Sequence, residues 1–239
     1  MKKLSLTLLT MTGLLSSAQA DLTVFAAAST SDALEEIARD FESKTQQKIR
    51  FSFAGSSLLG RQIEAGARVD LFLSADNVPI ERLEKQGAIK AADHRTLLGN
   101  TLVVIASGDG KTLTSPSELR TRGRIATGDP ETVPVGRYAK KWLEGEKLWA
   151  ELGKQIVPML DVRAALSAMA SGAIKIGIVY DSDARSNSHV HVIYRVPSEK
   201  TGIIYPVAAF TPAGRQFLQF LLTESARSTF ERLGFVVPR

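Results

Sequence analysis

The segment IRFSFAGSSLLGRQIEAGARVDLFLSA, residues 49–75, holds two apolar runs separated by a more polar stretch that contains glycine. The runs at 49–55 and 69–75 are rich in the β-branched and aromatic residues that favour strands. Between them, Ser56 and Ser57 lead into LLGRQIEAG, which predicts a helix. The segment therefore predicts a strand, a helix and a second strand, the repeating unit of α/β proteins with parallel strands.

The same alternation extends in both directions from this segment. Upstream, the run LTVFAAAS at 22–29 predicts a strand, and apolar residues recur at helical spacing over 34–41. Further strands are expected at 101–107, 124–129, 175–184 and 203–210, and further helices at 79–86, 136–148, 161–172 and around 217–222.

The strand and helix units form two sets of similar size, with no long Pro, Gly or Ser linker between them. This organisation favours two lobes joined by crossings near residues 98–101 and 202–206, with the C-terminal helix returning to the first lobe. Two short crossings would let the lobes close about a hinge. A single continuous doubly wound sheet is the alternative.

The N-terminal stretch MKKLSLTLLTMTGLLSSAQA, residues 1–20, has two lysines, an apolar run and an Ala-Gln-Ala end. This pattern predicts a secretory signal peptide cleaved after Ala20, and its interrupting threonines and serines argue against a membrane anchor. The chain has no cysteine, which excludes disulfides, thiolate metal sites, cysteine nucleophiles and a lipid anchor at the cleavage site. We therefore expect an exported protein of the bacterial periplasm.

Four segments place small or hydroxyl residues where a predicted helix begins. A helix N-terminus offers unpaired backbone N–H groups and the positive end of the helix dipole, so it binds anions without a formal charge. The hydroxyls of Ser29 and Ser56 could add donors, although a serine at such a turn also serves as an ordinary N-cap. The segments are FAAASTSDAL (25–34), FAGSSLLGRQIEAG (53–66), GDPETVPVGRYAK (128–140) and DVRAALSAMASG (161–172).

The distribution of charge narrows the class of anion. The AAAST and AGSSL loops contain no Lys or Arg, and the nearest cations are Arg61, Arg137 and Arg163, which could equally lie on the surface or in ion pairs. A site of neutral donors favours a fully ionised dianion and selects by size. Over the whole chain the net charge is only +5, with both signs interspersed, which argues against nucleic-acid binding.

Several blocks together resemble a known family: FAAAS, SFAGSSLLGRQIEAGARVDLFLSAD, GDPETVPVGRYAK, DVRAAL and GIVYDSDA, in this order. They resemble the periplasmic molybdate-binding proteins of ABC importers, the ModA family, from about Leu22 to the C-terminus. The resemblance implies an α/β fold of the type II periplasmic binding protein kind, in which each of two lobes is a mixed sheet flanked by helices. The lobes would span residues 21–98 plus 204–239 and residues 99–203.

The resemblance also implies a function and a binding site. Molybdate or tungstate would be held between the lobes and delivered to an ABC transporter permease by a monomer with no cofactor and no enzymatic activity. Molybdenum would be bound only as its oxyanion, without direct metal ligands. The family's ligand contacts carry over to Ser29, Ser56, Val135, Val162 and Tyr180, the serines and the tyrosine through hydroxyls and all but the tyrosine through backbone N–H groups. Val135 departs from the alanine often found there, which matters little for a backbone donor.

Two alternatives stay open. The first keeps the fold and changes the ligand to another anion, above all sulfate, which is also a fully ionised tetrahedral dianion. The second is a secreted serine hydrolase, but the G-x-S-x-G pattern starting at Gly55 fails at Leu59. Neither the SGDGKT loop, which lacks the first glycine of a P-loop, nor the pair His189 and His191, for which no third ligand is evident, supports another chemistry.

Overall fold

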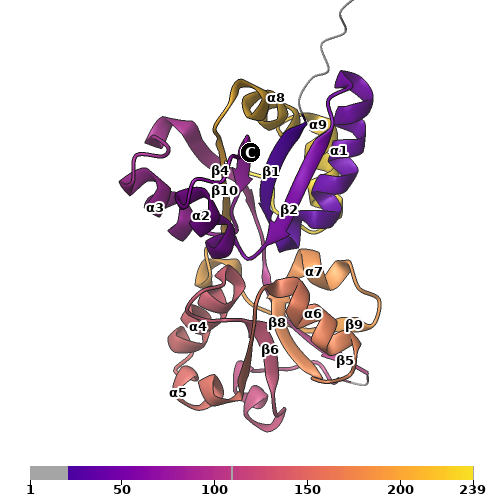
Figure 1. Ribbon diagram of the computed structural model, residues 1–239. Coiled ribbons are helices and arrows are strands. Elements are labelled where there is room, and N and C mark those ends of the chain that lie inside the picture. Colours follow the sequence, from indigo (N-terminus) through magenta and orange to yellow (C-terminus); the bar gives the residue numbers. More distant parts are fainter. Residues whose placement is uncertain (1–20, 109, 239) are drawn as a thin grey trace, which may run out of the picture.

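A computed structural model of the chain describes residues 21–108 and 110–238. The predicted signal peptide, residues 1–20, lies outside the described residues. The chain forms two lobes, each built on its own five-stranded sheet (Figure 1). Two separate sheets exclude the single doubly wound sheet. No helix within the described ranges is long and apolar enough to cross a membrane.

The first lobe contains the N-terminal and C-terminal parts of the chain, indigo and yellow in Figure 1. Its strands, in spatial order, are β2 (Ile49–Ala54), β1 (Leu22–Ala27), β3 (Leu71–Leu73), β10 (Ile204–Ala209) and β4 (His94–Gly99). Strands β1, β2 and β3 run parallel, whereas β10 runs antiparallel to both β3 and β4. The accompanying helices are α1 (Ser31–Thr45), α2 (Ser56–Glu64), α3 (Val78–Lys85), α8 (Pro212–Leu221) and α9 (Glu224–Arg232), with the short η1 (Ala28–Thr30) and η2 (Ala91–Asp93).

The second lobe repeats this plan with the middle of the chain. Its strands, in spatial order, are β7 (Ile156–Met159), β6 (Ile125–Gly128), β8 (Ile176–Tyr180), β5 (Leu102–Ser107) and β9 (Val190–Arg195). Strand β5 is antiparallel to both of its neighbours, so this sheet is also mixed. Its helices are α4 (Pro134–Gly145), α5 (Trp149–Leu152), α6 (Val162–Ala170) and α7 (Asp181–Arg185), with the short η3 (Pro116–Thr121), η4 (Gly153–Gln155) and η5 (Ser198–Lys200).

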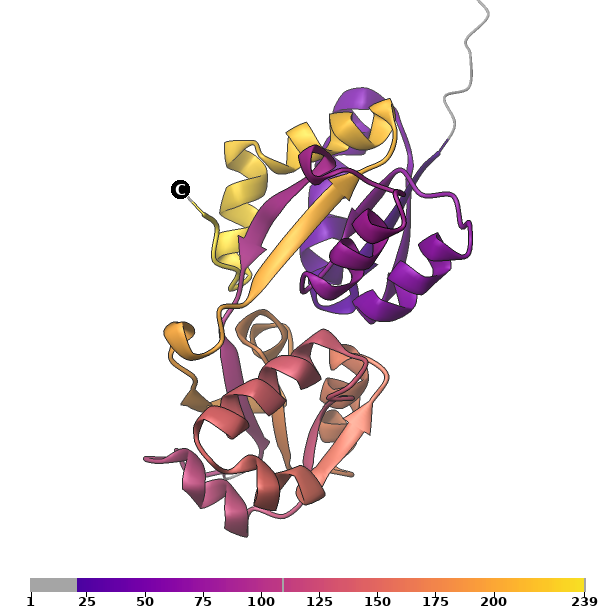
Figure 2. The ribbon, with the colours of Figure 1, turned by 90° about the vertical axis from the view of Figure 1, so that its left-hand side faces the viewer.

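The chain crosses between the lobes twice. The first crossing joins β4 to β5 through Asn100 and Thr101, and the second leads from β9 to β10. The two crossing segments lie side by side (Figure 2) because Ile204 pairs with Gly99 and Tyr205 pairs with Leu98. Two short adjacent links of this kind allow lobes to rotate as rigid bodies.

The structure differs from the expected elements in a few places. The C-terminal helix is two helices, because the Thr223 hydroxyl accepts a hydrogen bond from the Ala226 N–H and starts α9. The helix expected at 136–148 begins at Pro134, which suits a first helical position, and ends at Gly145. Strands β4, β7 and β9, which all lie at sheet edges, have no counterpart among the predicted strands. Strand β7 contains Pro158, whose missing N–H is tolerated at an edge.

Candidate functional site

A small pocket lies between the two lobes, and all five predicted ligand residues line it. Its cavity volume is about 10 Å³, which is too small for a sugar or an amino acid. Its lining comes from both lobes: Ala27, Ala28, Ser29, Ala54, Gly55, Ser56 and Ala75 from the first, and Val133, Pro134, Val135, Asp161, Val162 and Tyr180 from the second.

The starts of helices surround this pocket, and most of them lack a side-chain cap. The N-cap residues of η1, α2 and α4 are Ala27, Gly55 and Val133, none of which can accept a hydrogen bond through its side chain. Away from the pocket, α8 and α9 are capped by the hydroxyls of Thr211 and Thr223. The first-turn N–H groups at the pocket are therefore left for a ligand.

Val135 and Val162 both belong to such first turns. Val135 follows Pro134 at the start of α4, and Val162 is the first residue of α6. Their apolar side chains are buried in the core, so their polar contribution is the backbone N–H. Among the helices that begin at the pocket, α6 does have a side-chain cap, because the Asp161 carboxylate accepts a hydrogen bond of 2.8 Å from the Ala164 N–H. This bond directs the negative charge of Asp161 onto its own helix.

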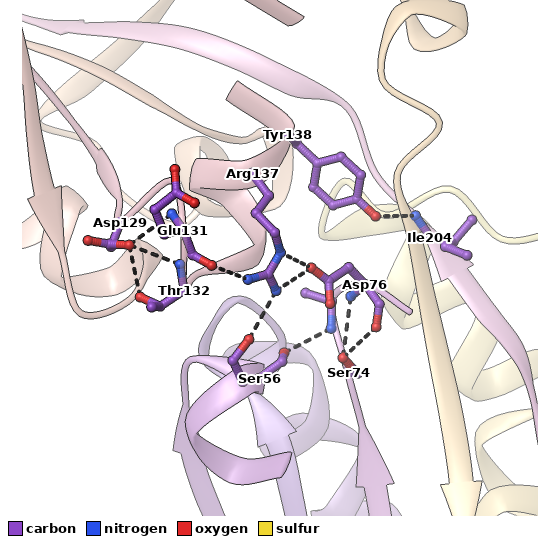
Figure 3. A network of polar contacts seen from close by, with 11 residues as sticks. Ser56, Ser74, Asp76, Asp129, Glu131, Thr132, Arg137, Tyr138 and Ile204 are labelled. Atoms are coloured by element: carbon purple, nitrogen blue, oxygen red, sulfur yellow. Dashed lines mark hydrogen bonds and ion pairs between the residues drawn. The ribbon is translucent and has the colours of Figure 1, made fainter. Parts of the chain in front are cut away.

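The two serines are buried, and each hydroxyl has a hydrogen-bond partner. The Ser56 Oγ accepts a 2.9 Å hydrogen bond from the Ala75 N–H, which leaves the Ser56 hydrogen free to donate (Figure 3). The Ser29 Oγ lies 2.9 Å from the Tyr205 hydroxyl, in a contact where either oxygen could donate. Ser56 therefore meets the requirement for a hydroxyl donor, and Ser29 meets it when Tyr205 is the donor in their shared hydrogen bond.

Tyr180 ends β8 with its side chain fully buried. Within the described part of the chain, its hydroxyl has no hydrogen-bond partner. Burial raises the pKa of Tyr180 well above its usual value, so the hydroxyl stays protonated. A buried hydroxyl without a partner is costly, by about 1–3 kcal/mol. An anion in the pocket would remove that cost by accepting the hydroxyl's hydrogen.

The predicted cations lie outside the pocket: of its described lining residues, none is a lysine or an arginine. Arg137 instead bridges the lobes, since its Nη2 lies 2.5 Å from the Asp76 carboxylate and 3.0 Å from the Ser57 Oγ (Figure 3). Burial raises the pKa of Asp76 even though Arg137 opposes the shift. Arg61 lines a surface groove beside the pocket.

Arg163 makes a second bridge on the α6 side. It pairs with Asp32 of the first lobe at 2.8 Å and with the fully buried Asp183 of its own lobe at 3.0 Å. Burial raises the pKa of Asp183 to about 7, against the influence of Arg163. The ion pairs of Arg137 and Arg163 therefore both join the two lobes, and we call this joined arrangement closed.

Several residues that shape this site received no role in the sequence analysis. Gly55 faces the backbone of the other lobe, because a Cβ at this position would lie 2.9 Å from the Leu160 carbonyl oxygen. Asp76 and Tyr205 contribute to the site by bonding to residues far away in the sequence, Arg137 and Ser29. For Gly55 the signal was present, since a glycine between a strand and a helix marks a close approach of backbones.

The site lacks the parts of a serine hydrolase. Among the described residues no histidine lines the pocket, and the Ser29 and Ser56 hydroxyls contact a tyrosine and a backbone N–H. A nucleophilic serine needs a base within hydrogen-bond reach. What the pocket offers is a set of uncharged donors around the space for one small anion.

Comparisons with known proteins agree with this geometry. Residues 22–236 match the family model described as bacterial extracellular solute-binding protein. The molybdate-binding protein ModA of Escherichia coli (strain K12) is 39% identical over 230 residues, covering 90% of this chain and 89% of that protein.

Two solved structures share the fold. The periplasmic molybdate-binding protein of Azotobacter vinelandii has a TM-score of 0.81 at 22% identity, with 92% of this chain and 100% of that chain covered. The sulfate-binding protein SubI of Mycobacterium tuberculosis H37Rv has a TM-score of 0.75 at 17% identity, with 91% and 86% covered. These similarities confirm the expected periplasmic binding protein fold.

Proposed function

This chain belongs to the bacterial extracellular solute-binding proteins and, within them, to the ModA family, and from that premise we propose that it captures molybdate or tungstate between its lobes for delivery to an ABC importer. The protein is a binding protein and not an enzyme. We place the lobe boundaries at residues 21–98 plus 204–239 and 99–203, and its site of action in the periplasm after cleavage at Ala20.

The observation that carries the proposal is the convergence of neutral donors on one small pocket. The Tyr180 hydroxyl is buried there without a partner, and the helix starts at Ala27, Gly55 and Val133 lack side-chain caps. These features favour an ion with four acceptor oxygens and no proton. We propose that Ser29, Ser56, Val135, Val162 and Tyr180 donate to it.

Sulfate is the competing ligand, because it has the same shape and charge and because a sulfate-binding protein shares the fold. A rigid cage of helix starts selects between such ions by size. Molybdate and tungstate have longer bonds to oxygen than sulfate, so a cage fitted to them holds sulfate with stretched, weaker hydrogen bonds. The similarity to the molybdate-binding protein of Escherichia coli supports molybdate or tungstate as the ligand in preference to sulfate.

A panel of anions tests the proposal directly. We expect molybdate and tungstate to raise the melting temperature of residues 21–239, because a ligand that binds only the folded state stabilises it by mass action. Sulfate, phosphate and chromate should leave it unchanged at the same concentration. A shift with sulfate alone would keep the fold and replace the ligand, and no shift with any anion would refute capture of an oxyanion.

Closure of the lobes gives a second prediction. Gly55→Ala places a methyl group 2.9 Å from the Leu160 carbonyl oxygen of the other lobe, a clash that exists only when the lobes are closed. We expect calorimetry to show molybdate affinity reduced about tenfold or more, the range of overpacking costs, because the clash is with a backbone atom. Thermal stability without ligand should not change.

The matched control is Gly145→Ala, since a Cβ at Gly145 meets no heavy atom within 4 Å. This variant should bind molybdate as the unmodified protein does. Equal affinities for the Gly55→Ala and Gly145→Ala variants would show that the ligand is held without the lobe contact at Leu160.

A further inference from the structure

A chain of buried polar groups runs along the hinge and ends at Ser29. Asn100 lies in the first crossing and Tyr205 in β10 at the second. The Asn100 Nδ2 lies 2.9 Å from the Ser182 Oγ and 3.4 Å from the Tyr205 hydroxyl, which in turn lies 2.9 Å from the Ser29 Oγ. Asn100, Ser182, Tyr205 and Ser29 are all at most 5% exposed. The chain thus connects both lobes and the hinge to a pocket residue.

The donors in this chain have a fixed direction. The Asn100 Oδ1 accepts a 2.8 Å hydrogen bond from the Thr101 N–H, which sets the orientation of the amide. Its NH₂ group can only donate, so the Tyr205 oxygen accepts. Of its two neighbours, only the Ser29 Oγ can accept the single hydrogen of Tyr205, so pairing that hydrogen requires Tyr205 to donate to Ser29. Ser29 is left with its own hydrogen, and the pocket is where that hydrogen can be donated.

We propose that Tyr205 is a positioning residue, which holds the Ser29 hydroxyl as a committed donor and thereby helps the site to reject protonated oxyanions; this rests on the proposed function. A free serine hydroxyl can rotate to donate or to accept. With Tyr205 donating to it, one of the two Ser29 lone pairs is occupied, and the Ser29 hydrogen is turned toward the ligand. A ligand oxygen that carries a proton, as in hydrogen phosphate, then meets a donor where it needs an acceptor, and the site cannot adapt.

The test is a double-mutant cycle measured by calorimetry with sodium molybdate. The four proteins are the unmodified chain and the Tyr205→Phe, Ser29→Ala and Tyr205→Phe/Ser29→Ala variants. We expect Tyr205→Phe to weaken molybdate binding by up to about tenfold, the order of one hydrogen bond between neutral groups. In the Ser29→Ala background, Tyr205→Phe should have no further effect, because the hydroxyl on which it acts is gone.

A competition experiment with phosphate supplies a second readout. The ratio of molybdate to phosphate affinity should fall in Tyr205→Phe, because the Ser29 hydroxyl can then rotate to accept a proton. Tyr194→Phe is the control: it removes the same atom from a tyrosine whose ring stacks on Trp142, away from the pocket. It should leave both affinities unchanged.

The outcomes separate this inference from the proposed function. If the unmodified protein does not bind molybdate, the proposed function fails. If it binds but Tyr205→Phe binds equally well, or weakens binding by the same factor with and without the Ser29 hydroxyl, Tyr205 is a structural residue of the hinge and the inference is overturned. Melting curves of each variant confirm that the folded protein is being compared.

Discussion

Arg137→Ala is expected to lower molybdate affinity by about a hundredfold or more, the largest effect of any single substitution considered for this protein. In the closed lobes Arg137 donates twice to one Asp76 oxygen, at 2.8 and 2.5 Å, and the Asp76 side chain is only 8% exposed. Removing one partner of a buried ion pair leaves an uncompensated buried charge, which costs about 3–5 kcal/mol. Opening the lobes restores water to Asp76, so the penalty falls on the closed, ligand-holding form.

The competing explanation is that Arg137 attracts the anion by its charge alone. The double variant Arg137→Ala/Asp76→Ala separates the two explanations in calorimetry. If the buried carboxylate is the cause, removing it as well should restore affinity to within about tenfold of the unmodified protein. If attraction is the cause, the double variant should stay as weak as Arg137→Ala. Arg61→Ala, which removes an exposed arginine of α2, is the control for net charge.

The pH dependence of molybdate binding by Arg137→Ala provides an independent test of the role of the Asp76 carboxylate. Burial already raises the pKa of Asp76, and Arg137 is the main influence that lowers it. Without the arginine this pKa rises further in the closed form, while in the open form the carboxyl is hydrated. The closed form therefore binds the proton more tightly, and lowering the pH favours closure. The variant's molybdate affinity should recover as the pH falls, and an affinity that falls further would contradict the role of Asp76.

Much of the fold could be predicted from the sequence because its strands and helices alternate in short, clearly bounded segments. The segment at 49–75 contains β2, α2 and β3 as expected. The first crossing was expected near residues 98–101, and the chain passes between the sheets at residues 100 and 101. The second was expected near 202–206, but this passage covers residues 196–203 and ends where β10 begins. The edge strands β4, β7 and β9 were not predicted. In β7 the proline in a short, partly buried strand masks the pattern.

The site was only partly accessible to sequence analysis. The four helix starts were evident from small residues that follow apolar runs, and the structure brings all four to one pocket. Tyr180 was selected through family resemblance, since a tyrosine that ends an apolar strand is usually a core residue. The bridges of Arg137 to Asp76 and of Arg163 to Asp32 depend on how two lobes meet, which one sequence does not specify.

Tyr180→Phe is expected to weaken molybdate binding by about 10- to 150-fold without lowering the stability of the ligand-free protein. The hydroxyl has no partner among the described residues, so its removal breaks no hydrogen bond in the ligand-free state. In the bound state it would donate to a charged oxygen, an interaction worth about 1.5–3 kcal/mol. Calorimetry and chemical denaturation of the same variant measure the two effects separately.

The combination of the two results is what identifies a ligand contact. If the tyrosine hydroxyl stabilised the core, the change to phenylalanine would lower the stability of the protein. If only the ring mattered, the change would lower neither stability nor molybdate affinity. The control Tyr194→Phe should behave in the second way. Unchanged molybdate affinity in Tyr180→Phe would remove Tyr180 from the site. Reduced affinity at full stability would mean that this buried hydroxyl is kept, at a cost to the empty protein, for the oxyanion.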